Sequence, residues 1–152
     1  MFVTLILTLV DKNTIVQVSD RRVTKPDGEI HDDNANKAVC IGMSYAHFAV
    51  SYTGLAYIGR AKIENRTDYW LLEHLGSISR NGIPTVEKIC RSLGEQATRP
   101  LSRLLGNYKP LEVVLTGYDR YNRSFRATVS NMKVNKAGFL EVVRERFVSN
   151  VR

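Results

Sequence analysis

The sequence has little of what metal sites and disulfide frameworks require. It contains only two cysteines, Cys40 and Cys90, and their spacing is not that of a metal-binding motif. Both lie in apolar patterns, which predicts buried free thiols in a reducing compartment. The histidines His31, His47 and His74 fall in different predicted elements and have no ligand spacing. The sequence therefore predicts no metal site and no cofactor.

We expect no targeting segment, and the sequence has no long apolar run. Residues 1–10 are hydrophobic, but they contain no basic start, and no small-residue cleavage site follows them. A transmembrane helix needs about 20 apolar residues, and this run is much shorter. We therefore expect a cytoplasmic protein with no membrane partner.

A basic tract is absent as well. The net charge of +7 permits binding to nucleic acids or anionic surfaces, but the lysines and arginines are scattered along the chain. We therefore expect the charge to serve solubility and assembly contacts, and nucleic acid is a disfavoured partner. With 152 residues, 43% of them hydrophobic and 24% charged, the composition is that of a single soluble globular domain over residues 1–152.

The first third of the chain reads as strands. Residues 2–10 are rich in β-formers, a turn follows, and residues 14–19 alternate in polarity, which predicts a hairpin. Two short strands are expected at 37–43 and 47–52. We expect Val3–Tyr52 to form most of one sheet.

From Gly54 the apolar residues recur at helical rather than strand spacing. This predicts a helix that begins at Gly54, either continuous or interrupted by a new N-cap at Thr67. A second helix is expected after Thr85 as its N-cap, with a kink or break at Pro100 because proline lacks the backbone donor.

Three more strands are predicted at Leu111–Thr116, Ser124–Met132 and Phe139–Phe147. The order is strands, helices, strands. It favours an α+β fold in which helices cover an antiparallel sheet.

Four residues form the inventory of a hydroxyl-nucleophile site: Thr4, Asp20, Lys37 and Gly54. A threonine hydroxyl needs a nearby base, and the chain's own α-amine, with a pKa of about 8, serves if the threonine is the first residue. A lysine held by an aspartate adds a positive charge that eases deprotonation of the hydroxyl. A glycine N–H at the start of a helix can receive the oxyanion of the substrate.

These motifs resemble the proteasome β subunits and their bacterial two-component relatives, which are N-terminal-nucleophile hydrolases. The resemblance runs from about Val3 to Asp119 and rests on four segments in the family order: Ser19-Asp20-Arg21-Arg22-Val23-Thr24, which is similar to the family's Ala-Asp-x-Arg-x-Thr; Lys37 before a short strand; Thr53-Gly54-Leu55-Ala56; and Gly117-Tyr118-Asp119, which matches a family Gly-x-Asp.

The resemblance implies a role for each residue. Thr4 would be the nucleophile, Asp20 would orient Lys37, Gly54 would donate to the oxyanion, and Thr24 would pair with the backbone of a peptide or amide substrate. It also implies a four-layer α/β/β/α sandwich of antiparallel sheets, and a homo-oligomer that stacks through its first two helices, where a surface with Tyr69 and Trp70 would suit a contact.

The chain also departs from the family pattern. Thr4 is preceded by Met1-Phe2-Val3 without a Gly-Thr processing junction, and the sequence stops before the family's later helices and its Gly-Ser-Gly segment, for which Ser149 is the nearest candidate. We therefore expect a domain that is incomplete at its C-terminus, either as a fragment or as a shortened relative.

Two function classes stay open. One is amide or peptide hydrolysis after cleavage before Thr4, with the chain that begins at Met1 inactive. The other is a non-catalytic, self-assembling subunit with the same fold. Without catalysis, Thr4 is simply a strand former, and Asp20 caps a turn or forms a structural ion pair with Arg22 or Lys37.

Overall fold

The structure is a computed structural model that describes residues 5–11, 13–24, 29–32, 35–58, 65–80, 85–102, 110–134, 140–142 and 148–151. Two helices lie among these residues, α1 (Thr67–Arg80) and α2 (Val86–Ser102). The strands are β1 (Ile6–Val10), β2 (Ile15–Ser19), β3 (Val23–Thr24), β4 (Ile30–Asp32), β5 (Ala38–Met43), β6 (Ala46–Gly54), β7 (Leu111–Asp119), β8 (Ser124–Ser130), β9 (Met132–Val134), β10 (Leu140–Val142) and β11 (Val148–Val151).

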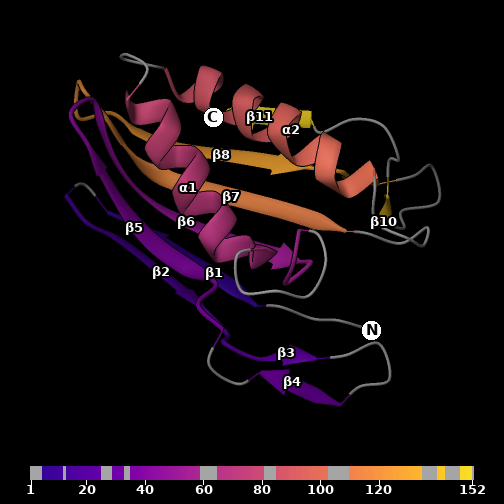
Figure 1. The fold of residues 1–152 in the computed structure, drawn as a ribbon. Coiled ribbons are helices and arrows are strands. Elements are labelled where there is room, and N and C mark those ends of the chain that lie inside the picture. The colour runs from indigo at the N-terminus through magenta and orange to yellow at the C-terminus, as the bar shows by residue number, and fades with distance from the viewer. Residues whose placement is uncertain are drawn as a thin grey trace.

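The centre of the fold is an antiparallel sheet with the strand order β11-β8-β7-β6-β5 (Figure 1). Its two longest strands, β6 and β7, lie side by side, with Val50 opposite Leu115 and Tyr52 opposite Val113. Because side chains alternate along a strand, these four residues point to one face of the sheet. All four are buried.

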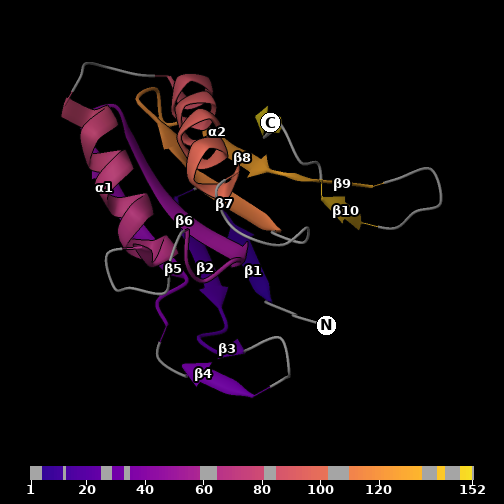
Figure 2. The same cartoon turned by 45° about the vertical axis from the view of Figure 1, so that its right-hand side comes forward.

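Both helices cover that face, as Figures 1 and 2 show from two directions. Leu71 and Leu75 of α1 and Ile89 and Leu93 of α2 are at most 1% exposed and belong to the same core as the inward side chains of β6, β7 and β8. Burying a side chain of this size contributes about 1.5–3 kcal/mol relative to leaving it exposed. The apolar stripes of the two helices therefore hold them on the sheet.

The hairpin of β1 and β2 lies over the opposite face, where residues of β1 border residues of β6, β7 and β8. The prediction of a hairpin is confirmed, with Leu7 opposite Val18. The prediction that Val3–Tyr52 forms most of one sheet is wrong. The segment contributes to three sheets, because β1 pairs with β2, β3 pairs with β4, and β5 joins β6 in the central sheet.

The fold is thus α+β, with antiparallel sheets and two helices among the described residues. These residues form a helical layer, the central sheet and the hairpin. The fourth layer of the expected sandwich stays a prediction. No helix in the described ranges is long and apolar enough to cross a membrane.

The first helix begins later than Gly54. Residues 55–58 are not helical; Tyr57 instead forms an isolated antiparallel bridge with Arg66. The Thr67 side chain donates to the Leu55 carbonyl oxygen at 2.6 Å, which ties the start of α1 to the end of β6. The predicted new start at Thr67 is confirmed, whereas the helix expected to begin at Gly54 is wrong over residues 54–58.

The second helix starts where it was expected. The Ile89 N–H donates to the Thr85 carbonyl oxygen at 3.0 Å, and the Lys88 N–H donates to the Thr85 hydroxyl at 3.4 Å, so Thr85 is the N-cap. Of the predicted kink or break at Pro100, the break is wrong, because α2 runs through Pro100 to Ser102. A kink there stays a prediction.

The strand predicted at Ser124–Met132 is divided at Asn131. The buried Asn131 side chain accepts a hydrogen bond from the Leu111 N–H at 2.8 Å, and the Asn131 N–H donates to the Leu111 carbonyl oxygen. This reciprocal contact ends β8 and secures the start of β7. In the predicted strand Phe139–Phe147, only β10 is described, and residues 143–147 lie outside the described ranges.

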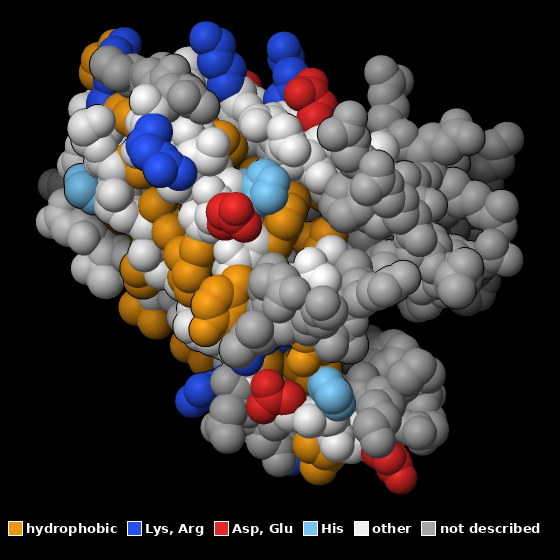
Figure 3. Space-filling model, viewed as in Figure 1, with side chains coloured by type: hydrophobic (Ala, Val, Ile, Leu, Met, Phe, Trp, Pro, Cys, Tyr) orange, Lys and Arg blue, Asp and Glu red, His pale blue; other side chains and the backbone are white. Residues whose placement is uncertain are grey.

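The surface of α1 differs from the expectation at one residue. Tyr69 is 50% exposed and Leu72 is 44% exposed, whereas Trp70 is only 8% exposed and belongs to the core. Figure 3 shows hydrophobic side chains across the middle of this face and separate, rather than continuous, lysine and arginine side chains. Self-association through α1 stays a prediction, with Tyr69 and Leu72 as its apolar residues.

The two cysteines differ in exposure. Cys90 is buried in α2, and burial raises the pKa of its thiol to about 12. Cys40 in β5 is exposed, so the prediction of a buried thiol is wrong there. The strand β5 forms one edge of the central sheet, which leaves its outer residues less covered than the pattern indicated.

Candidate active site

The predicted contact between Asp20 and Lys37 is present. Lys37 directly precedes β5, and its Nζ lies 2.8 Å from Asp20 Oδ1. The same ammonium group also donates to the Arg22 carbonyl oxygen. Lys37 is only 6% exposed, whereas the Asp20 side chain is 35% exposed. A lysine charge is therefore held inside the protein beside a carboxylate that water can still reach.

The start of the hairpin lies next to this ion pair. The Asp20 N–H donates a hydrogen bond to the Leu5 carbonyl oxygen at 3.2 Å, which continues the ladder between β1 and β2 by one residue pair. Thr4, the predicted nucleophile, lies outside the described residues. Leu5, the residue that follows Thr4, is thus held beside Asp20, which binds Lys37.

Gly54 lies at the same end of the central sheet as Lys37. The Tyr52 N–H donates to the Lys37 carbonyl oxygen at 3.2 Å, and Gly54 follows two residues later, at the end of β6 and opposite Leu111. Its φ of 98° is in the region that favours glycine. Gly54 therefore occupies a strand end, rather than the start of a helix as the sequence indicated.

Replacing Gly54 with alanine should destabilise the fold. A Cβ at this position would lie 2.0 Å from the Pro110 carbonyl oxygen, and the positive φ adds strain. We expect a loss of more than about 2 kcal/mol in the free energy of unfolding, measured by urea denaturation.

Gly76 provides the matched control for this substitution. It lies in α1, and no atom lies within 4 Å of the position that an added methyl group would take, so Gly76→Ala should stabilise the protein by about 0.5–1 kcal/mol. A Gly54→Ala variant with an unchanged urea midpoint would contradict the described geometry.

Thr24, the predicted substrate-pairing residue, lies in β3. It pairs with Ile30 of β4, and the register shifts between Val23 and Thr24. This short strand follows Arg22, whose carbonyl oxygen accepts a hydrogen bond from Lys37. Thr24 is therefore close in sequence to the ion pair, and its pairing with a substrate stays a prediction.

A second charged cluster lies near Tyr52 and was not predicted. Arg66 donates to Asp68 at 2.8 Å and lies 4.0 Å from Asp32. The hydrogen bond to Asp68 is the main cause that raises the pKa of Arg66, and burial followed by the Asp68 charge raises the pKa of the Tyr52 hydroxyl. Tyr52 therefore stays neutral. In the sequence, the one local indication of this cluster was Asp68, an acidic residue in the first turn of α1.

The Gly-x-Asp match at the end of β7 has a local structural role. Asp119 accepts hydrogen bonds from the Arg123 guanidinium, which is the main cause that lowers its pKa, and from the Arg123 and Tyr121 N–H groups. A Cβ at Gly117 would lie 2.2 Å from the His47 carbonyl oxygen, so the strands pack too closely for another residue. These contacts shape the turn between β7 and β8.

No group of three or more His, Cys, Asp or Glu residues in the described part of the chain could hold a metal ion. Ser149, the candidate for the family's later serine, lies in β11, opposite Val129. No protein-family model matches the chain, and no curated protein matches its sequence.

Proposed function

We propose that the chain is an N-terminal-nucleophile hydrolase with a proteasome-like α/β/β/α sandwich, which cleaves amide or peptide bonds once proteolysis has made Thr4 its first residue. We propose further that it acts in the cytoplasm and assembles with copies of itself. The observation that supports the proposal is the buried Lys37 ammonium group, bound to Asp20 beside the start of the hairpin.

The chemistry requires each group in turn. In a chain that begins at Thr4, the α-amine accepts the hydroxyl proton while Oγ1 attacks the substrate carbonyl carbon. The positive charge of Lys37 favours this deprotonation, and its burial strengthens the effect because the surroundings are less polar than water. The Gly54 N–H would stabilise the oxyanion.

The second half of the reaction follows from the same groups. The C–N bond breaks, the leaving amine takes the proton held by the α-amine, and an ester on Thr4 forms. A water molecule then gives up a proton to the α-amine and attacks the ester, which releases the acid and restores the Thr4 hydroxyl.

The test compares chains that begin at Thr4 and at Met1. Both are incubated with a set of N-acyl peptide coumarin amides, and release of the fluorescent amine is followed. We expect slow turnover only by the chain that begins at Thr4. Thr4→Ala in that chain should abolish it. Turnover by the Met1-started chain that survives Thr4→Ala would contradict the assigned nucleophile.

A non-catalytic assembly subunit is the second candidate function, and the exposed apolar residues Tyr69 and Leu72 of α1 favour it. Light scattering at micromolar concentration tests the assembly. A clean monomer would contradict self-association, and it would leave the hydrolase proposal to be decided by the turnover measurement.

A further inference from the structure

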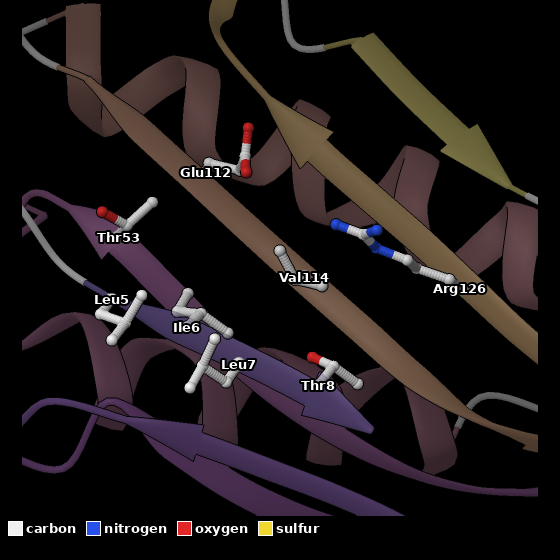
Figure 4. Close-up of a pocket in the computed structure, with 8 residues that line it drawn as sticks. All are labelled: Leu5, Ile6, Leu7, Thr8, Thr53, Glu112, Val114 and Arg126. Carbon is white, nitrogen blue, oxygen red and sulfur yellow. The ribbon is translucent and has the colours of Figure 1, made fainter. Parts of the chain in front are cut away.

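A groove runs along the outer edge of β1. It has a volume of about 350 Å³, and the sticks in Figure 4 show the side chains that surround it. Its lining consists of Leu5, Ile6, Leu7, Thr8, Thr53, Glu112, Val114 and Arg126. Successive side chains of a strand point to opposite faces. A cavity bordered by Leu5 and the first three residues of β1 must therefore follow the edge of that strand.

The backbone groups of this edge point into the groove. The bond from the Asp20 N–H to the Leu5 carbonyl oxygen fixes the ladder between β1 and β2. In an antiparallel ladder, every second residue of a strand bonds to its neighbouring strand. Leu7 and Leu9 therefore also bond to β2, and the N–H and C=O groups of Ile6 and Thr8 point away from β2, into the groove. Within the described residues, β1 pairs with β2 alone.

The floor of the groove carries one charge of each sign. Glu112 lies opposite Thr53 near the Leu5 end of β1, and Arg126 lies towards the Thr8 end (Figure 4). Val114 lies between the two. Neither charged side chain forms a salt bridge with another described residue. The floor is therefore complementary to a ligand with a basic group and an acidic group at a distance from each other.

The outer face of the hairpin is apolar and exposed. Its large side chains are between 45% and 67% exposed: Leu5, Leu7, Leu9, Val16 and Val18. A two-stranded sheet is marginally stable by itself, and an unpaired strand edge is a template for another strand. An added strand would extend this apolar face and would satisfy the backbone groups of β1.

We propose that the groove binds an extended segment of a partner polypeptide, which adds to β1 as a third strand. Alternate side chains of the segment point inward, with a basic one at Glu112 and an acidic one at Arg126. The remaining side chains are apolar and lie beside Leu5 and Leu7. The proposal is independent of the chemistry at Thr4.

A second copy of the chain does not fit this groove through its own β1. Antiparallel pairing of two β1 strands about a two-fold axis places both central sheets on the same side of the hairpins. On that side, each molecule's own central sheet extends past the edge of β1, as the groove residues Glu112, Val114 and Arg126 show. The two central sheets would overlap, so a single extended segment is the occupant that the geometry permits.

The first test uses charge exchange and the chain that begins at Met1. Two fluorescent peptides alternate apolar and polar residues. Each has one acidic and one basic side chain on the face that would point into the groove, and the order of these two side chains along the chain is reversed between the peptides. Binding is measured by fluorescence anisotropy. We expect the native protein to prefer one order by about fivefold or more, as two exposed ion pairs allow. The double variant Glu112→Arg/Arg126→Glu should reverse the preference. Absence of binding, or a preference that the exchange does not change, would overturn the proposal.

The second test addresses the backbone of β1. Thr8→Pro removes an N–H group that faces the groove but makes no bond to β2, so the hairpin should persist and peptide binding should fall by about tenfold. Thr8→Val is the control, because it removes only the hydroxyl that accepts from Gln17 at 3.4 Å and should keep the affinity. Equal affinities of the two variants would overturn strand addition. If Thr8→Pro does not fold, the charge exchange decides. Because binding is measured without turnover, its result is separate from that of the hydrolase proposal.

Discussion

Amide hydrolysis by the chain that begins at Thr4 is expected to fall by about a hundredfold or more when Lys37 is replaced by methionine, since the proposed mechanism uses its fixed charge to favour deprotonation of Thr4. The ammonium group of Lys37 lies 2.8 Å from Asp20 and is almost completely buried. In the Lys37→Met variant, water therefore cannot easily reach this position to stabilise the reacting groups in place of the lost charge. The measurement is the rate of release of the coumarin amine at saturating substrate.

The control for Lys37→Met is Lys88→Met. Lys88 is an exposed lysine of α2, on the helix that covers the other face of the central sheet, and its loss should leave the rate unchanged. Equal rates for the native chain and a folded Lys37→Met variant would show that the ion pair is structural.

The second large effect concerns stability. Asp20→Ala removes the carboxylate that lies 2.8 Å from the buried ammonium of Lys37, and we expect the free energy of unfolding to fall by about 2 kcal/mol or more. Lys37→Met should cost less than about 1 kcal/mol, because it removes the buried charge itself and leaves Asp20 in contact with water. Urea denaturation at neutral pH measures both.

The double variant Asp20→Ala/Lys37→Met completes the cycle. It should be more stable than Asp20→Ala alone, because the buried charge that Asp20 stabilises is gone. Two results would contradict a stabilising role of Asp20 toward the buried charge. One is a larger loss of unfolding free energy for Lys37→Met than for Asp20→Ala, and the other is a loss in the double variant equal to the sum of the two single losses.

The parts of the fold that follow from short-range patterns could be predicted. The alternation of residues 14–19 gave the hairpin, and Thr85 gave the start of α2. The pairing of Asp20 with Lys37 was also predicted, but from a family resemblance in motif order rather than from local physics. Neither residue by itself carries a signal for the other.

The parts that depend on contacts distant in sequence could not be predicted. Residues 55–58 have helical spacing, but the bond from Thr67 to the Leu55 carbonyl oxygen and the bridge at Tyr57 hold them in a non-helical connection. The division of a strand at Asn131 depends on a side chain that bonds to Leu111, twenty residues away. Such contacts leave no periodic pattern.

The groove beside β1 illustrates the same limit for function. Glu112 and Arg126 are unremarkable strand residues in the sequence, and they come together only because β7 and β8 pair under the hairpin. Thr24 and Gly54, by contrast, were named from motifs. The structure places them near the ends of strands, and their roles in a reaction stay proposals.

The intact mass of the chain isolated from its native cells tests whether Thr4 is the nucleophile. We expect a chain that lacks the mass of Met1, Phe2 and Val3 and begins at Thr4, with a free α-amine that reacts with amine-specific reagents. A native chain that retains Met1 throughout would contradict the claim, because the hydroxyl of Thr4 would then have no α-amine to act as its base.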